Sequence, residues 1–197
     1  MRKWLLLVWL MIPVLAGAYH YGPGQEQMVL DRAARILALA DRCAADQQWL
    51  EAEQQYEQAL QLLPADQIDQ QRRVRLERSK AQLFIAKLPI AHRELKQLVD
   101  ELQDDPETDS TLLDDARSTL ANSQYYLTWL MRLEGQPRKA WEPEIEAARQ
   151  TFRLLAEQAD GSQDATGAQR NREDLEATIR LARMDLGDLQ GLPLPTQ

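Results

Sequence analysis

The sequence predicts an all-α protein of about seven antiparallel helices, with a further short helix at the N-terminus. Gln, Ala, Leu, Glu and Arg, all strong helix formers, dominate the 197 residues, of which only 8 are Gly and 9 are Pro. Apolar residues recur at intervals of three and four, the period of a helix with one buried face. No stretch alternates β-branched or aromatic residues with polar ones, so we expect no strand.

Residues 1–18 have the composition of an export signal. Arg2 and Lys3 precede an apolar stretch from Trp4 to Leu15, and small residues at 16–18 suit signal peptidase. We expect cleavage after residue 18, a spacer over 19–25, and a periplasmic or secreted protein. The alternative is an uncleaved N-terminal anchor as the sole membrane contact, although a span needs about 20 apolar residues.

The first hairpin is expected over residues 25–63. One face of a helix over 25–43 is apolar, at Val29, Ala33, Ile36, Ala40 and Cys43. A second helix over 47–63 has five residues predicted to face inward: Leu50, Tyr56, Ala59, Leu60 and Leu63. Pro64 ends this helix, since proline lacks the amide hydrogen that continues it.

This hairpin resembles a tetratricopeptide repeat, a helix–turn–helix unit of about 34 residues. The resemblance rests on small, aromatic and proline residues at the family's positions: Ala40, Trp49, Ala52, Tyr56, Ala59 and Pro64. The chain departs from the family at Ile36 and Cys43, where Trp and Tyr are usual. The resemblance implies an α-solenoid whose first helices line a peptide-binding groove.

Two more hairpins and a terminal helix follow, which extends the repeat-like region over 26–159. The expected helices cover 72–87, 89–102, 111–134, about 143–158 and 169–190. Pro143 is predicted at the first position of its helix. A flexible loop is expected over 160–168 and an extended tail over 191–197. The segments 125–135 and 141–150 also resemble parts of exported bacterial proteins, which implies no activity.

Charge and residue content exclude several functions. With 31 acidic and 23 basic residues, the chain lacks the basic footprint that nucleic acid requires. It has 2 histidines and 1 cysteine, too few for a typical zinc site, so we expect no metal and no cofactor. No nucleophile, base and orienting residue can be combined, and no phosphate-binding motif occurs, so we expect no enzyme.

Two features are candidate partner contacts. Five basic residues occur within nine positions: Arg72, Arg73, Arg75, Arg78 and Lys80. The resemblance implies that four residues here line the groove, with the bases holding a peptide carboxylate: Arg73, Leu76, Lys80 and Phe84. The other interpretation is a solvated face paired with Glu77 and the acidic loops. Tyr125 is expected to be exposed, because it lies off the apolar flank formed by Tyr126, Trp129, Leu130 and Leu133.

The final helix carries an apolar stripe at coiled-coil spacing: Leu175, Ile179, Ala182, Leu186 and Leu189. Such a stripe either covers the end of the repeat stack or forms a homodimer with a second copy. The sequence therefore predicts an exported adaptor or scaffold that binds a protein or peptide. The alternative is a self-associating subunit of an envelope complex.

Overall fold

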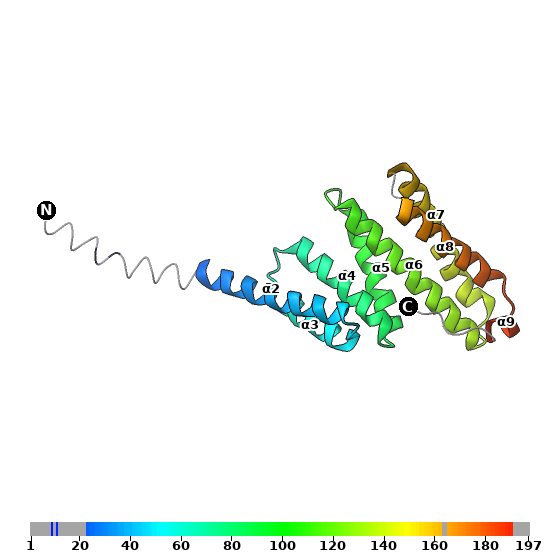
Figure 1. Ribbon diagram of the computed structural model, residues 1–197, viewed down its shortest axis with the longest axis horizontal. Coiled ribbons are helices and arrows are strands. Elements are labelled where there is room, and N and C mark those ends of the chain that lie inside the picture. Colours follow the sequence, from blue (N-terminus) through cyan, green and yellow to red (C-terminus); the bar gives the residue numbers. More distant parts are fainter. Residues whose placement is uncertain (1–8, 10, 12–22, 163–164, 191–197) are drawn as a thin grey trace. The chain divides into compact units, whose positions relative to one another are not determined.

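The computed structural model describes residues 9, 11, 23–162 and 165–190, which contain eight helices and no strand (Figure 1). The helices are α2 (Pro23–Ala45), α3 (Trp49–Leu62), α4 (Ile68–Phe84), α5 (Leu88–Asp104), α6 (Ser110–Leu133), α7 (Arg138–Ser162), α8 (Ala165–Arg183) and α9 (Leu186–Gln190). The prediction of an all-α protein is confirmed. The expected export signal (residues 9 and 11 apart), its cleavage site and the tail lie outside the described residues.

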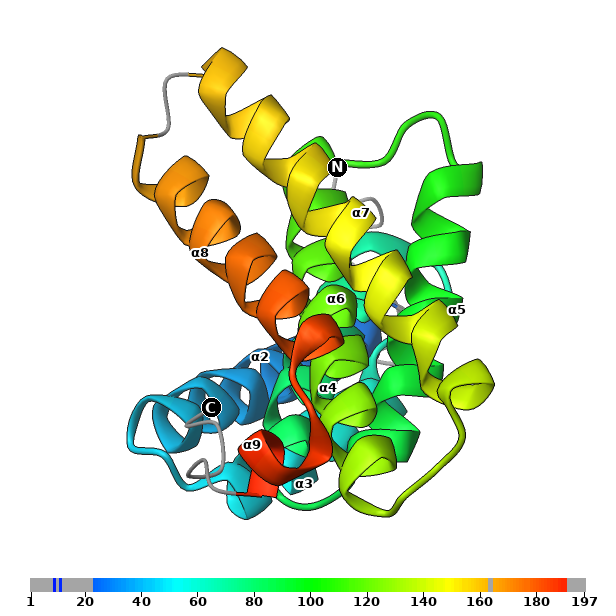
Figure 2. The ribbon, with the colours of Figure 1, turned by 90° about the vertical axis from the view of Figure 1, so that its right-hand side faces the viewer.

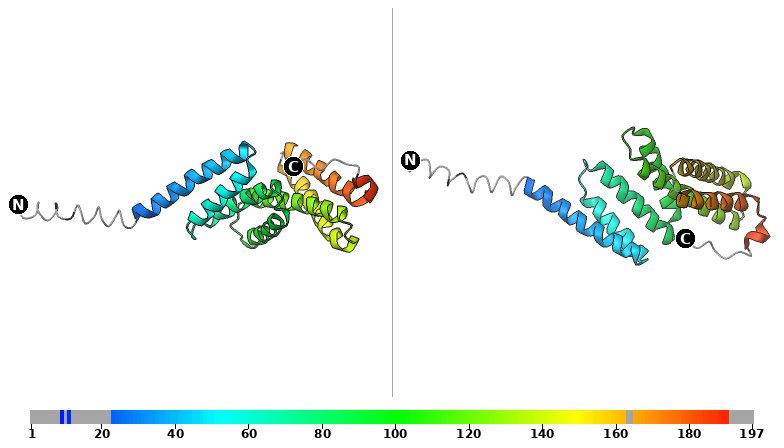
Figure 3. Two further views of the ribbon diagram at one scale, coloured as in Figure 1. Left: turned by 90° about the horizontal axis from the view of Figure 1, so that it is seen from below. Right: turned by 45° about the horizontal axis from the view of Figure 1, so that its top comes forward.

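The chain divides into two compact units, residues 1–74 and 75–197, and α4 begins in the first and ends in the second. In the first unit, α2 and α3 lie side by side as an antiparallel hairpin (Figure 3). Four alanines along them are fully buried: Ala33, Ala40, Ala52 and Ala59. Alanine lets two helices approach closely, and the gap beside it is filled by Tyr56, which is 2% exposed.

The Tyr56 side chain also makes a polar contact at the edge of this hairpin. Its hydroxyl donates a hydrogen bond of 2.8 Å to the carboxylate of Asp41 on α2. The prediction that Leu50 faces inward is wrong, because this side chain is 49% exposed. Leu50 precedes buried Ala52 by two residues, about 200° around the helix, and therefore lies opposite the buried face.

In the second unit, consecutive helices are antiparallel neighbours, and α7 and α8 lie side by side (Figure 2). Several apolar clusters lie among these helices. Leu76 of α4 packs with leucines of α5 and α6. Phe152 of α7 packs with alanines of α6 and α7. Trp129 of α6 packs with Ile145, Leu181 and Leu189, which connects α6 to α7, α8 and α9.

The single terminal helix predicted over 169–190 is interrupted after Arg183. The carboxylate of Asp185 accepts a 2.8 Å hydrogen bond from the amide of Asp188 and so caps the short helix α9. The predicted apolar stripe is therefore not one face. Leu189 is buried, whereas Ala182 and Leu186 are exposed, and the buried residue of the last turn of α8 is Leu181.

Three other predictions along α6–α8 are corrected by the structure. Pro143 is inside α7, not at its first position, because the helix already begins at Arg138. Most of the predicted loop over 160–168 is helical, since α7 continues to Ser162 and α8 begins at Ala165. Leu130 is 41% exposed and lies outside the core, since it directly follows buried Trp129 and is rotated from it by about 100°.

Replacing Tyr56 tests the packing of the first hairpin. We expect Tyr56→Ala to lower the free energy of unfolding by about 3–5 kcal/mol, as large aromatic truncations in cores do. The matched variant Tyr56→Phe keeps the ring and removes the hydrogen bond to Asp41, so its cost is about 0.5–1.5 kcal/mol. Urea denaturation followed by circular dichroism measures both. Equal costs for the two variants would show that ring burial does not stabilise this hairpin.

Candidate interaction surface

The residues predicted to line a groove on α4 are in different environments. Leu76 is 1% exposed and packs in the core against Leu95 and Leu98, so its prediction as a partner contact is wrong. The sequence of α4 did not reveal that Leu76 is buried, because basic residues flank it on both sides. The structure shows that Leu76 nevertheless faces α5. Arg73 is exposed, and Phe84, the last residue of α4, is 36% exposed.

The basic side chains of α4 are joined to carboxylates of neighbouring helices. Arg75 binds Glu101 of α5 through both guanidinium nitrogens, at 2.5 and 3.0 Å. Arg78 binds Glu94, also of α5, at 2.6 Å. Such pairs satisfy the charges within the protein itself. The structure therefore favours the interpretation of a paired face, although the acids belong to helices and not to the predicted acidic loops.

Lys80 illustrates this pairing best. Its ammonium lies 2.7 Å from Asp115 of α6 and 2.9 Å from Glu77. Burial lowers the pKa of Lys80, but the hydrogen bonds with Asp115 and Glu77 outweigh burial and raise the pKa above 10.5. Binding a partner's carboxylate here would require breaking two existing contacts.

Tyr125 lies at a hollow formed by α6, α7 and α8. The hollow has a volume of about 90 Å³, and six residues line it: Asn122, Tyr125, Tyr126, Phe152, Asp174 and Ala177. Tyr125 is half-buried, so it is less exposed than predicted. Its ring meets the ring of Tyr126 edge-on, with centroids 5.5 Å apart and planes at 80°. Phe152 at this site is fully buried.

Asp174 is the one acidic residue in the lining of this hollow. Burial raises the pKa of the Asp174 carboxyl, and the charge of Glu173 raises it further. Burial likewise raises the pKa of Tyr125, although the charge of Arg180 lowers it and that of Asp174 raises it. Burial also raises the pKa of Tyr126, and Tyr125 and Asp174 add to that shift. Among the described residues, no side chain forms an ion pair or hydrogen bond with the partly desolvated carboxylate of Asp174.

A second hollow, between α7 and α8, contains ion pairs within its own lining. It has a volume of about 260 Å³ and is lined by Trp141 together with arginines and glutamates of α7. Arg138 binds Glu142 at 2.6 Å, and Arg149 binds Glu146 at 2.5 Å. Hydrogen bonds from Arg149 and Gln150 lower the pKa of Glu146 to about 2. Local pairs thus satisfy most of the charge in this lining.

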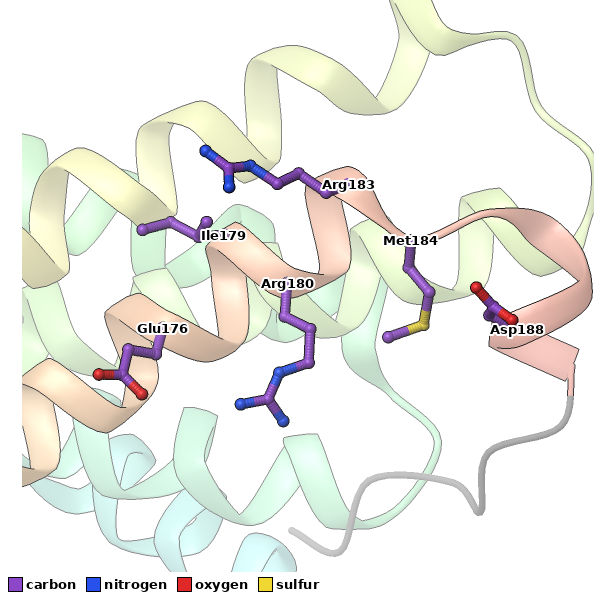
Figure 4. Close-up of a pocket in the computed structure, with 6 residues that line it drawn as sticks. All are labelled: Glu176, Ile179, Arg180, Arg183, Met184 and Asp188. Carbon is purple, nitrogen blue, oxygen red and sulfur yellow. The ribbon is translucent and has the colours of Figure 1, made fainter.

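A third hollow lies along the outer side of α8 and α9 (Figure 4). It is broad and open, with about 480 Å³ of space, and its lining carries both signs of charge: Glu176, Ile179, Arg180, Arg183, Met184 and Asp188. In Figure 4, Arg183 and Ile179 point to one side of α8, and Arg180 points to the other. Ala182 and Leu186 are exposed close by in the sequence.

A polar cluster joins α5, α6 and α7. Nδ1 of His92 lies 3.1 Å from the hydroxyl of Ser123, and Nε2 lies 3.7 Å from the carboxylate of Glu144. Histidine, serine and a carboxylate are the residue types of hydrolytic triads. Here Ser123 is 0% exposed, and its hydroxyl donates a 2.7 Å hydrogen bond to the carbonyl of Leu120. A substrate cannot reach this oxygen, so the cluster fits a connection between helices.

The described part of the chain offers neither a grouping of metal-binding side chains nor a membrane-spanning helix. No group of three or more His, Cys, Asp or Glu residues there is arranged to hold a metal ion. None of the helices described is both long enough and apolar enough to cross a membrane.

Comparison with known protein families and with curated proteins finds no match to this chain. The function must therefore be argued from the surfaces themselves.

Sequence reasoning identified Tyr125 and missed Asp174. The dense aromatic residues on α6 were a usable signal for the first. The sequence contains no comparable signal for Asp174, because it is one of 31 acidic residues. Its burial depends on how α6, α7 and α8 pack. The polar cluster around His92 was also missed, since Ser123 and Glu144 are distant in sequence.

His92 makes stability depend on pH. Burial lowers its pKa below 6.5, while the Glu144 carboxylate opposes this shift and the Lys96 ammonium adds to it. As pH falls below about 6.5, the unfolded chain takes up a proton before the folded chain does, so the free energy of unfolding should fall. We expect His92→Gln to remove this decrease between about pH 6.5 and the lower folded pKa. Urea denaturation across this range measures it, and an equal slope in the variant would contradict the assignment.

Proposed function

We propose that this chain is an exported, non-catalytic interaction protein that binds a protein or peptide through the face of α6 and α8 around Tyr125. The observation that carries the proposal is the hollow in which two tyrosine rings adjoin the carboxylate of Asp174, which has no ion-pair partner among the described residues. Tyrosine is enriched at interfaces because it combines a large apolar body with a polar tip.

The resemblance to tetratricopeptide repeats supports the choice of this face. In that family the first helix of each hairpin lines the inner groove. Counting hairpins from α2, the first helices are α2, α4, α6 and α8, and the last two carry Tyr125 and Asp174. The close alanine packing of α2 against α3 agrees with the repeat pattern of the sequence.

Two further observations weigh against a carboxylate-binding groove on α4 and against an enzymatic function. The basic residues of α4 already have carboxylate partners, including Glu101, Glu94 and Asp115. An enzyme would need an accessible nucleophile, whereas Ser123, the serine nearest a histidine nitrogen, is fully buried and bonded to a backbone carbonyl. A binding role at the tyrosine hollow is thus better supported than either.

Site-specific photo-crosslinking in the producing cell tests this function. A photoreactive phenylalanine analogue at Ala177, on the hollow, should yield a discrete crosslinked partner. The same analogue at Gln158, an exposed residue of α7, serves as the control. The adduct at position 177 should disappear with Tyr125→Ala, provided that the variant retains its helicity. Equal adducts at both positions, or none at position 177, would contradict the proposal.

Self-association is the second candidate function, and the outer side of α8 favours it. When two copies of α8 pair antiparallel about a twofold axis near residues 179–180, Glu176 of one copy lies opposite Arg183 of the other. The two charges are then complementary across a self-matching contact. The apolar centre of the contact would come from Ile179 and the exposed Ala182.

The Ala182→Glu variant tests self-association. Because Ala182 is exposed, we expect the variant to keep the melting temperature of the parent chain while placing a charge at the centre of the contact. Sedimentation velocity should show a dimer for the parent chain and a monomer for the variant. Gln158→Glu, an equal charge change on α7, should leave the dimer intact. A monomeric parent chain at about 100 µM would exclude this candidate.

A further inference from the structure

Four of the six residues that line the hollow beside Tyr125 are polar: Asn122, Tyr125, Tyr126 and Asp174. Asp174 is the one residue of this lining whose side chain carries a carboxyl group. Ionised carboxylates only accept hydrogen bonds, whereas ammonium and guanidinium groups only donate them. The lining therefore complements a donor with a positive charge.

No Lys or Arg of the described residues belongs to the lining of this hollow. Arg180 influences the pKa of Tyr125, but the charge that acts on Asp174 is the like charge of Glu173. Among the described residues, Asp174 has no ion-pair partner. Burying an unpaired charge is unfavourable, and the cost is recovered when a cation with matching hydrogen bonds arrives.

The size of the hollow limits what enters it. About 90 Å³ accommodates a group of a few heavy atoms, such as an ammonium or a guanidinium, but not a folded ligand. The buried Phe152 contributes an apolar surface on which the methylene stem of a long side chain can rest. Two tyrosine rings in the lining also attract a cation through their π-electrons.

We propose that this hollow binds the cationic head group of a lysine or arginine side chain of the partner. The inference rests on the proposed function, because it names the chemistry of the segment that docks on α6 and α8. It also reverses the charge expected from sequence, since the partner segment is basic and does not present a carboxylate. A net charge of -8 on the chain attracts such a segment before contact.

Other ligand classes fit the lining less well. An anion would meet the charge of Asp174 with no arginine or lysine in the lining to offset it. A neutral apolar group would leave the carboxylate desolvated and unpaired. A divalent metal prefers several oxygen or nitrogen ligands, and the lining offers one carboxylate.

Binding of capped amino acids to the full chain tests the inference. The probes are Nα-acetyl-lysine amide and Nα-acetyl-arginine amide, and Nα-acetyl-norleucine amide is the neutral control of equal stem length. NMR chemical shifts of the Asn122 side chain and the tyrosine rings report binding. We expect saturable shifts in the millimolar range with both cationic probes and none with norleucine.

The Asp174→Asn variant should weaken binding of the cationic probes at least tenfold, which corresponds to about 1.4 kcal/mol. The matched variant Glu176→Gln removes an exposed carboxylate of the same helix outside this hollow and should leave affinity unchanged. Folding is monitored by the melting temperature. Because the folded state raises the pKa of Asp174, its charged form is disfavoured there, and Asp174→Asn should not lower stability at neutral pH.

Three results would overturn the inference: no shifts with either cationic probe at about 100 mM, equal shifts with norleucine, or unchanged affinity in Asp174→Asn. The test is separate from that of the proposed function. Probe binding without a crosslinked partner at position 177 would leave the cation site standing and reject the interaction role. A crosslinked partner without probe binding would do the reverse.

Discussion

The position of α8 depends on one buried guanidinium, that of Arg132 on α6. It donates hydrogen bonds to the carbonyls of Leu181 and Met184, where α8 ends, and it is only 8% exposed. The last carbonyls of a helix have no partner within it, so an arginine from a neighbouring helix both satisfies them and fixes the helix end. Since α8 carries Asp174 and α6 carries the tyrosine pair, this contact holds the two sides of the hollow together.

Close approach of the helices depends on alanine. Eight alanines among the described residues are 0% exposed, four in each unit: Ala33, Ala40, Ala52, Ala59, Ala91, Ala116, Ala121 and Ala148. A small side chain brings two backbones together, and a large one must then fill the space beside it. Tyr56 does so in the first unit and Phe152 in the second. Because Phe152 is held in this way, it forms a fixed surface of the hollow.

Periodicity predicted which segments are helical, but it assigned some side chains to the wrong face. Leu76 is in the core while its basic neighbours bind acids of adjacent helices, because α4 packs through leucine and arginine together. Proline is favoured at the first position of a helix, which predicts a helix start at Pro143, whereas the chain tolerates this proline inside α7. The tyrosines of the candidate site could be noticed from composition. The role of Asp174 could not, since desolvation arises only when three helices meet.

The distribution of paired and unpaired charge is what favours a basic segment as the proposed partner. On α4, evolution of a carboxylate-binding groove would leave arginine or lysine without internal acids, yet Arg75, Arg78 and Lys80 all have them. On α8 the situation is inverted, because Asp174 is partly buried and lacks a cation among the described residues. A fold optimised for stability alone would gain by removing that charge, and function is the usual reason for retaining such a cost. The charge that the described residues of this surface lack is positive, and the proposed partner segment would supply it.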